Sequence, residues 1–405
     1  MSLSRRRHLR DGRIVWQSFP QPAIVGSPLR RSTHADVVII GAGISGAMLA
    51  QSLTEAGFHP LIVDRRRAAL LGSTAASTAL LQFELDTPLS HLSARLGARK
   101  AGRIWLASRD AVNELRTRTV RLGIDAALST RPSLYLAGNV LDARGLRHET
   151  RLRQSVGLAS EYLDRKTLLH HFGLRCPAAI LSHGDAEANP VQLAGGYLKR
   201  ALRAGARFHA PHDIVDLRRS ARGIELSTAD GLELSARHVV LCTGYELARI
   251  VPSEDSHTTS TWAIATRRQP RAIWPQRALI WQSSSPYLYL RSTADGRVIC
   301  GGEDAQVNDA AERDRMTPRK AQRLAVKLTR LLPAVNARPQ FAWSGTFATS
   351  ANGMPTIGQI PGFPRCYAVM GYGGNGITFS MLASRLITAA IMKRRLPEAR
   401  LFAFS

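Results

Sequence analysis

Apolar residues near the start of the chain form two short continuous runs, separated by glycines and a longer segment with helical periodicity. Residues 37–40 are β-branched, the pattern of a strand buried on both faces. Residues 44–56 carry apolar side chains at helical spacing and end before Gly57, a common residue after a helix C-terminus. Residues 61–63 are again apolar and end on Asp64. The pattern predicts a strand, a helix and a second strand.

A similar order of elements begins near the end of the chain. Residues 365–370 favour a strand, and Gly371, Gly373 and Gly376 follow at once. Residues 377–392 are small and apolar at helical spacing, and Arg394-Arg395 and a short tail come next. The pattern predicts a strand, a glycine-rich loop and a helix, but no following strand that ends on an acid.

The middle of the chain predicts both helices and strands. Residues 86–125 and 307–332 are rich in Arg, Ala and Leu and favour helices. Strands are expected from 205 to 215, at 223–226, 232–234, 238–244, 287–290 and 297–300, with hairpin turns at 229–231 and 295–296. We therefore predict an α/β (α+β) fold, in which a nucleotide-binding sheet built from both ends of the chain is interleaved with a second, mixed-sheet domain.

Composition excludes several classes of protein. The 405 residues contain no apolar stretch of membrane-spanning length, and Arg5-Arg6-Arg7 is followed by polar residues and not by the apolar core of a signal peptide. The four cysteines are far apart and form no zinc or redox motif. We expect no metal site, no disulfide framework and a cytoplasmic location.

The formal net charge of +25 allows a nucleic-acid partner. Arginine supplies nearly all of the excess, and its residues are scattered along the chain apart from residues 5–7 and 65–67. No aromatic-interleaved basic motif of the kind that stacks bases is present. A compositional bias toward arginine is therefore favoured, and nucleic acid is not the expected partner.

The first glycine loop has the features of a dinucleotide site. Gly41 allows the tight turn, Gly43 lets the backbone approach a pyrophosphate, and Gly46 lets helix and strand pack closely. The helix N-terminus supplies unpaired N–H groups, and Asp64 is placed to accept hydrogen bonds from a ribose diol. The alternative is a glycine-rich turn in an ordinary α/β unit.

The second glycine loop has the same spacing but a different expected use. Because no further strand with an acid follows, a second nucleotide site is rejected. The geometry instead offers a helix N-terminus that would suit the pyrimidine end of a flavin ring, where negative charge collects on reduction.

Five stretches together resemble the superfamily of FAD-dependent D-amino-acid oxidase, glycine oxidase and sarcosine oxidase. They are residues 35–64, 72–77, 239–244, 343–358 and 371–376, in the family's order. The resemblance implies FAD and hydride transfer from a C–H next to an amine nitrogen onto flavin N5, after which the imine is hydrolysed. It implies that substrate alignment, more than a strong protein base, carries the reaction.

The resemblance also implies a domain division and a set of cofactor residues. The FAD-binding domain is expected at 31–84, 186–250 and 340–405, the substrate domain at 85–185 and 251–339, and an N-terminal extension at 1–30. The expected cofactor-binding residues are Gly41, Gly43, Ile44, Ser45, Gly46, Asp64, Arg65, Ser73, Thr74, Ala75, Ser77, Ile214, Thr243, Gly244, Gly345, Gly373, Gly374, Asn375, Gly376 and Ile377.

The chain departs from the family pattern at the substrate site. Glycine-oxidase-type members hold the substrate carboxylate with two arginines, at positions that are Phe347 and Gly374 here. A small free amino acid is therefore a less suitable substrate. Arg291 is the candidate replacement, because Tyr287, Tyr289 and Arg291 alternate on one strand face; that face could instead be solvent-exposed.

Two further departures concern the flavin. The lysine that assists oxygen reduction in sarcosine-oxidase-type members aligns near Ile299, where this chain has no lysine, so prompt reaction with oxygen is not expected. The electron acceptor is oxygen or, as the competing interpretation, a quinone or electron-transfer protein. The cysteine that links flavin covalently in some members aligns near Gly345, so FAD is expected to be non-covalent.

Other residues have two interpretations. Ser73, Thr74 and Ser77 could bond flavin or cap a helix. Trp262 and Trp343 could line the substrate cavity, although large aromatic residues more often lie in the core. Gln82, Glu84 and Asp86 are interpreted as a polar strand edge. The favoured substrate is an amine or N-substituted amino acid; an RNA-linked flavoenzyme is the alternative from another class.

Overall fold

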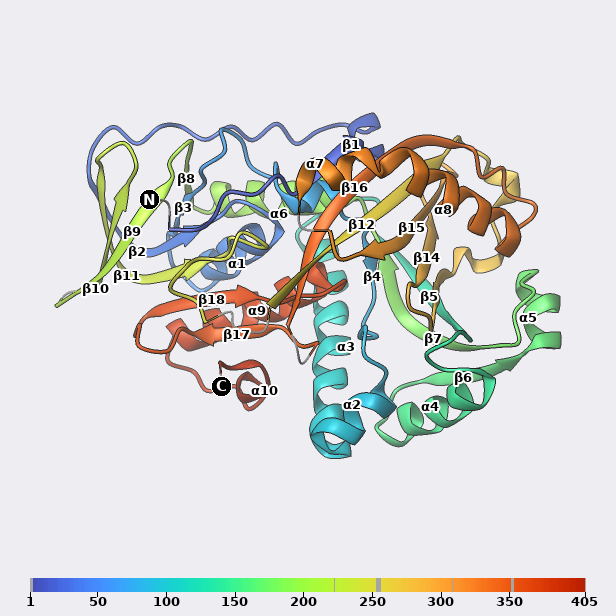
Figure 1. Ribbon diagram of the computed structural model, residues 1–405. Coiled ribbons are helices and arrows are strands. Elements are labelled where there is room, and N and C mark those ends of the chain that lie inside the picture. The colour runs from blue at the N-terminus through green and yellow to red at the C-terminus, as the bar shows by residue number, and fades with distance from the viewer. Residues whose placement is uncertain (1–2, 222, 253–255, 308, 351–352, 405) are drawn as a thin grey trace.

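The structure is a computed structural model, and it describes residues 3–221, 223–252, 256–307, 309–350 and 353–404. Two β-sheets form the framework (Figure 1). The first lies on the left of Figure 1 and the second on the right, with the long helix α3 (Ala98–Arg121) between them. The predicted α/β architecture with two mixed sheets is confirmed.

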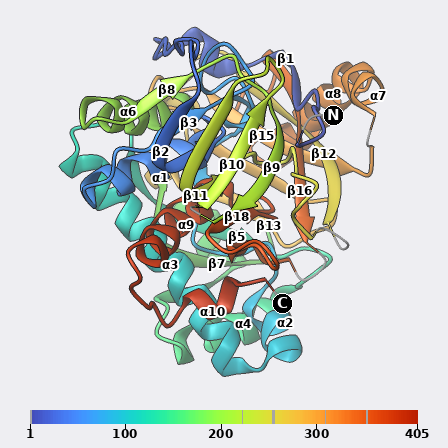
Figure 2. The ribbon, with the colours of Figure 1, turned by 90° about the vertical axis from the view of Figure 1, so that its left-hand side faces the viewer.

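The first sheet has a parallel centre. Its strand order is β17-β18-β11-β2-β3-β8, and the four pairings from β18 to β8 are parallel. β9 and β10 continue from β11 as an antiparallel hairpin on one face, which Figure 2 shows toward the viewer. The bounds are β2 Thr33–Ile40, β3 Leu61–Val63, β8 Arg207–His209, β9 Ile214–Ser220, β10 Gly223–Thr228, β11 Glu233–Leu241, β17 Thr356–Gln359 and β18 Cys366–Met370.

Three helices cover the other face of this sheet. α1 (Ile44–Glu55) packs against α6 (Pro190–Arg203) and α9 (Gly376–Ile391), and α3 packs against α9. Val37 and Ile39 face this helical layer, whereas Val38 and Ile40 face the β9–β10 side. A run of four β-branched residues is therefore buried on both faces, as its sequence predicts.

The second sheet is larger and mostly antiparallel. Its order is β1-β16-β12-β15-β14-β13-β5-β7-β4, with β6 paired to β7 and a parallel pairing between β13 and β5. The bounds are β1 Arg10–Arg13, β4 Leu80–Leu81, β5 Ser129–Leu136, β6 Ser160–Asp164, β7 Ala178–Glu187, β12 Ser256–Thr266, β13 Leu279–Gln282, β14 Leu288–Ser292, β15 Val298–Ala305 and β16 Pro339–Ser350.

One long helix packs on this sheet, and the smaller helices are distributed over both sheets. α8 (Thr317–Leu331) packs on β12, β15 and β16 and buries Leu324 and Leu328. The remaining helices are α2 Leu89–Leu96, α4 Ala143–Ser155, α5 Arg165–Phe172, α7 Ala310–Arg315, α10 Ala399–Phe402, and the 3₁₀ helices η1 Val15–Ser18, η2 Ser73–Ala76, η3 Pro270–Ala272 and η4 Pro275–Arg277.

Most predicted elements are present, and the differences have local causes. Each long helical region is two helices: Gly97, at φ +81°, separates α2 from α3, and Met316 separates α7 from α8. The strand predicted from 205 to 215 is also two, β8 and β9, which pair with different neighbours. Pro211 lies between them and has no N–H for a ladder.

The N-terminal residues are part of the fold and not a separate extension. β1 pairs with β16 along its whole length, and Trp16 is buried. β16 itself lies in the second sheet, although the predicted boundaries assign residues 340–350 to the FAD-binding domain. The domain division therefore stays a prediction, with the second sheet extending further than expected.

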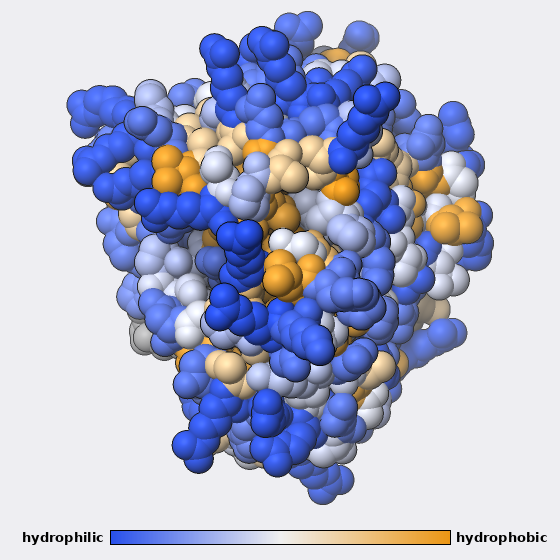
Figure 3. Space-filling model, turned by 90° about the vertical axis from the view of Figure 1, so that its right-hand side faces the viewer, coloured by the Kyte–Doolittle hydropathy of each residue, from blue (hydrophilic) through white to orange (hydrophobic). Residues whose placement is uncertain are grey.

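The face of the molecule shown in Figure 3 is mostly polar. Figure 3 shows a face dominated by hydrophilic side chains, with apolar residues in small separate groups. Among the described residues, no helix combines the length and the apolar composition that crossing a lipid bilayer requires.

Candidate active site

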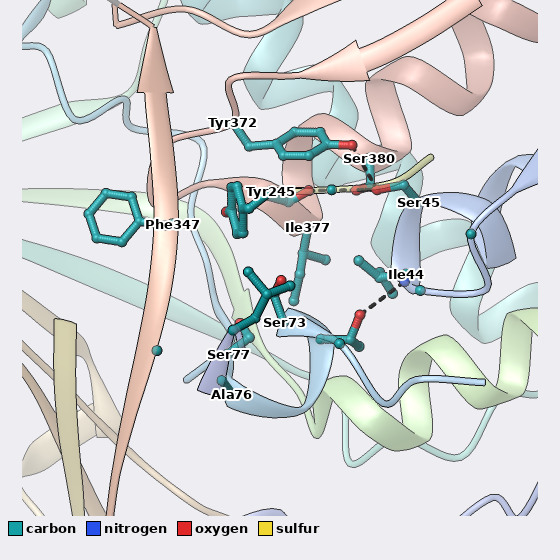
Figure 4. Close-up of a pocket in the computed structure, with 18 of the residues that line it drawn as sticks. Ile44, Ser45, Ser73, Ala76, Ser77, Tyr245, Phe347, Tyr372, Ile377 and Ser380 are labelled. Atoms are coloured by element: carbon teal, nitrogen blue, oxygen red, sulfur yellow. Dashed lines mark hydrogen bonds between the residues drawn. The ribbon is translucent and has the colours of Figure 1, made fainter. Parts of the chain in front are cut away.

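One cavity is lined by residues of both sheets, and Figure 4 shows part of its lining. Its first end is formed by the β2–α1 loop and the end of β3, and its other end by β14, β16 and residues 80–86. Predicted cofactor residues that line it are Gly41, Gly43, Ile44, Ser45, Asp64, Arg65, Ser73, Thr74, Ser77, Ile214, Thr243, Gly244, Gly345, Gly373, Gly374, Asn375, Gly376 and Ile377. The fold thus brings together residues that are more than 300 positions apart.

The β2–α1 loop needs its glycines for geometry. Gly41 has φ +111°, a conformation that side chains disfavour. A Cβ at Gly46 would lie 1.9 Å from the Gly41 carbonyl oxygen, so no side chain fits there. Gly43 caps α1 without a side-chain hydrogen bond, and the Ile44 N–H donates to Thr74 Oγ1 at 3.0 Å. The helix N-terminus therefore presents backbone to the cavity.

Asp64 stands at the carboxyl end of β3 and is 9% exposed. Its Oδ2 accepts from Ala42 N–H and its Oδ1 from Arg66 N–H, both at 2.8 Å. Burial raises the pKa of the Asp64 carboxyl, and these two hydrogen bonds oppose the rise. Since each carboxylate oxygen can accept more than one hydrogen bond, Asp64 keeps capacity for a ligand hydroxyl.

The N-terminal segment closes this end of the cavity. Leu3 N–H donates to Ile214 O at 2.9 Å, and Leu3 and Ser4 line the cavity. Arg65 donates to the Ser4 hydroxyl and lies 3.4 Å from Asp213 Oδ1. Arg65 and Ile214 belong to the predicted site, whereas Leu3 and Ser4 were outside it because their sequence carries no recognisable motif.

The second glycine loop is tied to residues 82–86. Asn375 Nδ2 donates to Glu84 O at 2.6 Å, and Thr378 Oγ1 donates to Gln82 O at 2.9 Å. Gly374 N–H donates to Asp86 Oδ2 at 2.9 Å. These bonds hold the N-terminus of α9 against the cavity, where it can face a flavin ring.

The two glycine-loop helices also meet directly. Ser45 Oγ lies 2.9 Å from the Tyr372 hydroxyl and 2.8 Å from Ser380 Oγ (Figure 4). Ser45 belongs to α1 and Ser380 to α9, so hydroxyl hydrogen bonds fix the spacing of the two helix N-termini.

Aromatic side chains form the far end of the cavity. Phe347 of β16, Tyr289 of β14, and Tyr245 and Tyr287 from neighbouring loops line it. Burial raises the pKa of all three tyrosines, so they stay neutral at ordinary pH and can donate hydrogen bonds. Tyr289 and Phe347, both candidate substrate-site residues, line the cavity, and their role at the substrate stays a prediction.

Residues 80–86 form one wall of the cavity, and interpreting their polar members as a strand edge is wrong. Leu80, Gln82, Glu84 and Asp86 line the cavity. Leu81, Phe83 and Leu85, which alternate with them, are buried in the core. The period-two alternation in Leu-Leu-Gln-Phe-Glu-Leu-Asp is the sequence signal that could have revealed this wall.

Arg291 does not reach the cavity, which contradicts its prediction as a substrate anchor. It is 2% exposed, and its Nη1 donates to the carbonyl oxygens of Ala79 (3.0 Å) and Ala188 (3.1 Å). Its guanidinium carbon lies 5.3 Å from the centre of the Trp16 ring. Ala79, which accepts a hydrogen bond from Arg291, lines the cavity together with Tyr287 and Tyr289, whereas Arg291 does not.

Several other candidates also lie outside the cavity lining. Trp262 Nε1 donates to Arg313 O, and Trp343 Nε1 donates to Ala76 O; both rings are buried core. Ala76 and not Ala75 lines the cavity, and Gly46 packs α1 against the loop. Asn352, part of the fourth family-like stretch, lies outside the described residues.

The residues present fit FAD. A buried acid after β3 and a helix N-terminus at which Gly43 provides no side-chain cap suit the adenosine and pyrophosphate, and the α9 N-terminus with η2 suits the flavin ring. Gly345 offers no nucleophile, and burial raises the pKa of the Cys242 thiol, which also lines the cavity, to about 12, so that it stays protonated. Non-covalent binding stays the prediction.

The chain is similar to several known proteins in sequence or in fold. γ-Glutamylputrescine oxidoreductase of Escherichia coli (strain K12) is 25% identical over 371 residues, covering 89% of this chain and 84% of that protein. Glycine oxidase of Geobacillus kaustophilus has a similar structure, with a TM-score of 0.75 and 21% identity over 92% of this chain and 98% of that one. L-proline dehydrogenase of P. horikoshii gives a TM-score of 0.76 and 16% identity, covering 92% and 97%.

A family model described as FAD dependent oxidoreductase (DAO) matches residues 36–390, nearly the whole of the two-sheet fold. That range includes both glycine loops and the residues that line the far end of the cavity. The chain therefore belongs to the DAO family of FAD-dependent oxidoreductases.

Proposed function

We propose that this flavoenzyme oxidises the C–N bond of a primary or secondary amine or of an N-substituted amino acid. One observation carries the proposal: the cavity joins a dinucleotide end to an aromatic end whose lining, among the described residues, contains no basic side chain. The basic residues that line the cavity are Arg65, Arg66 and His212, all beside Asp64 or Asp213. A free carboxylate at the far end would have no cationic partner.

Bound FAD supplies a two-electron acceptor for the hydride on the carbon next to the amine nitrogen. The chain itself aligns and shields the substrate. Tyr245, Tyr287, Tyr289 and Phe347 exclude water and present flat apolar surfaces. Because the tyrosines stay protonated, they act as hydrogen-bond donors and not as bases.

The electron acceptor is proposed to be oxygen or a quinone or electron-transfer protein. The described cavity lining contains no lysine that could assist oxygen reduction. We propose a cytoplasmic location, in agreement with the free state of the four buried cysteines.

An RNA-linked role is the less supported alternative. Residues 65–67 are one of two tight arginine clusters, but Arg65 contacts Ser4 and Asp213, and Arg66 lies 2.9 Å from Glu246. Two of the three guanidinium groups are thus used inside the fold. Binding to tRNA is expected to be weak, salt-dependent and non-selective, and selective binding at physiological salt would instead support the RNA-linked alternative.

Anaerobic bleaching of the flavin tests the proposal. Purified protein is expected to carry flavin that acid or heat releases, and a panel of amines and amino acids is mixed with it without oxygen. Larger amines or N-substituted compounds are expected to bleach the flavin, and glycine and sarcosine to do so poorly. Admission of air then separates an oxidase, which reoxidises at once, from a dehydrogenase. Fast, saturable bleaching by glycine would contradict the proposal.

A further inference from the structure

The two ends of the cavity differ in charge. At the first end, Arg65, Arg66 and His212 accompany Asp64 and Glu246. At the far end, Glu84 and Asp86 line the wall, and no lysine, arginine or histidine of the described chain lines it with them. Buried or enclosed charges require partners, so an excess of carboxylates around a ligand space points to a cationic ligand.

A backbone hydrogen bond fixes the position of the Asp86 carboxylate at this end of the cavity. Its Oδ2 accepts from Gly374 N–H at 2.9 Å, and no described residue forms an ion pair with it. A Cβ at Gly373 would lie 2.6 Å from Asp86 Oδ2, so the bare glycine backbone makes room for the carboxylate. The side chain is accessible within the cavity, and the surrounding protein atoms raise the pKa of its carboxyl.

Glu84 adds a second carboxylate, which is buried. It is 2% exposed and lines the cavity. Its carboxyl group faces the carboxyl group of the buried Asp185, and burial together with Glu84 raises the pKa of Asp185 well above its usual value. Arg153 Nη1 lies 3.6 Å away, but Arg153 Nε donates to Glu149 Oε1 at 2.9 Å. One guanidinium therefore faces Glu84 and Glu149, and Asp86 has none.

Asp304 of β15 lies next to two residues that line the cavity. It neighbours Thr261 and Tyr287, which line the cavity, and its Oδ1 is buried without a hydrogen-bond partner. Glu303, the next residue, takes Lys320, Arg323 and Lys327 as its ion-pair partners. No ion pair to Asp304 is formed within the described part of the chain.

We propose that the far end of the cavity binds a second ammonium group of the substrate, so that the enzyme selects diamines or oligoamines, with Asp86 as the ion-pair partner and Glu84 and Asp304 adding negative charge. This inference rests on the proposed amine oxidation. One amine nitrogen lies at the reacting carbon, and the distal ammonium compensates the carboxylates. A distal carboxylate is repelled, and a distal methyl group leaves the carboxylates without a partner.

Three ligands of equal chain length test the inference on the flavin-loaded enzyme: 1,4-diaminobutane, butylamine and 4-aminobutanoate. Binding is measured from the shift of the oxidised flavin spectrum and reaction from anaerobic bleaching. 1,4-Diaminobutane is expected to bind at least tenfold more tightly than butylamine, and 4-aminobutanoate more weakly than both.

Asp86→Asn keeps an oxygen for Gly374 N–H but removes the charge. The substitution is expected to weaken the binding of 1,4-diaminobutane at least tenfold and to change the binding of butylamine less than about threefold. The matched control is Asp125→Asn, which changes an exposed acid outside the cavity lining. Equal losses for all three ligands would overturn the role of Asp86.

The outcomes separate the inference from the proposed reaction. If no ligand bleaches the flavin but 1,4-diaminobutane still binds most tightly, amine oxidation fails and the cation site stands. If butylamine bleaches the flavin and binds as well as 1,4-diaminobutane, amine oxidation stands and the inference fails. Should Asp86→Asn lose flavin, the ranking of the three ligands on the unchanged enzyme decides.

Discussion

The two glycine loops have the same spacing, Gly-x-Gly-x-x-Gly, and each meets an aspartate through one backbone N–H. Ala42 N–H donates to Asp64 at 2.8 Å, and Gly374 N–H donates to Asp86 at 2.9 Å. The resemblance ends there. Asp64 follows β3, the strand that pairs with β2, and its second oxygen accepts a backbone hydrogen bond from Arg66. Asp86 belongs to the cavity wall formed by residues 80–86, and only its Oδ2 accepts a backbone hydrogen bond.

The third glycines differ as well. Gly46 has no space for a Cβ, which would lie 1.9 Å from the Gly41 carbonyl oxygen. At Gly376 the nearest atom would be the Tyr245 hydroxyl oxygen, at 3.5 Å. The first loop is thus a tight strand-to-helix crossing that suits a dinucleotide, and the second is an open helix start that faces a ring. Spacing alone does not determine the role of such a loop; its neighbours do.

The largest expected difference between the two loops is the effect of replacing their third glycines by alanine. Gly46→Ala is expected to destabilise the flavin-free protein by about 3 kcal/mol and to leave almost no bound flavin, because the clash is with rigid backbone. Gly376→Ala is expected to change that stability by less than about 1 kcal/mol, since a helix start tolerates alanine. Urea unfolding and the flavin-to-protein ratio measure both. Equal losses in the two variants would show that the loops are equivalent.

The next largest effect tests whether Arg291 belongs to the far end of the cavity or only stabilises the fold. Arg291→Ala is expected to lower the free energy of unfolding by about 3 kcal/mol, because it leaves the buried carbonyls of Ala79 and Ala188 without a donor. The relative bleaching rates with carboxylated and neutral amines are expected to stay the same. Arg271→Ala, at an exposed arginine, is the control. A selective loss for carboxylated substrates would restore Arg291 as an anchor.

The two aspartates offer a smaller, direct contrast. Asp64→Asn is expected to raise the dissociation constant of FAD about tenfold, because an amide oxygen replaces a carboxylate that accepts two backbone bonds and faces the expected ribose. Asp86→Asn is expected to leave FAD affinity within about threefold, since Gly374 N–H keeps an acceptor. Flavin titration of the two apoproteins checks this. Similar losses of affinity would place both acids at the cofactor.

The smallest effect concerns pH at the far end. Burial raises the pKa of the Asp304 carboxyl to about 6. Its negative charge is therefore present above about pH 6 and is lost as the pH falls through that value. The preference for 1,4-diaminobutane over butylamine, taken as a ratio of bleaching rates, is expected to fall several-fold below pH 6. Asp304→Asn is expected to remove that step, and a ratio that is flat with pH in the unchanged enzyme would exclude Asp304.

Local sequence was sufficient for the elements whose role depends on near neighbours. The run at 37–40, the glycines that follow and Asp64 all lie within 30 residues, and strand pairing between β2 and β3 brings them together in any α/β unit of this kind. The hairpin of β10 and β11 is equally local. Residues 205–215 show the limit, because their division into β8 and β9 depends on which strands lie beside them.

The far end of the cavity was decided by tertiary structure. Tyr289 and Arg291 have the same strand alternation, but Ala79 and Ala188 cover only the arginine. The position of Asp86 at the proposed ammonium site depends on its hydrogen bond from Gly374, which is 288 residues away in the sequence. Sequence by itself determined that a dinucleotide binds, because the backbone that holds a pyrophosphate is built by adjacent residues, and the resemblance of five stretches to a known family implied that the dinucleotide is FAD. The charge that meets the substrate is set by side chains from both sheets, and only the folded chain brings them to one place.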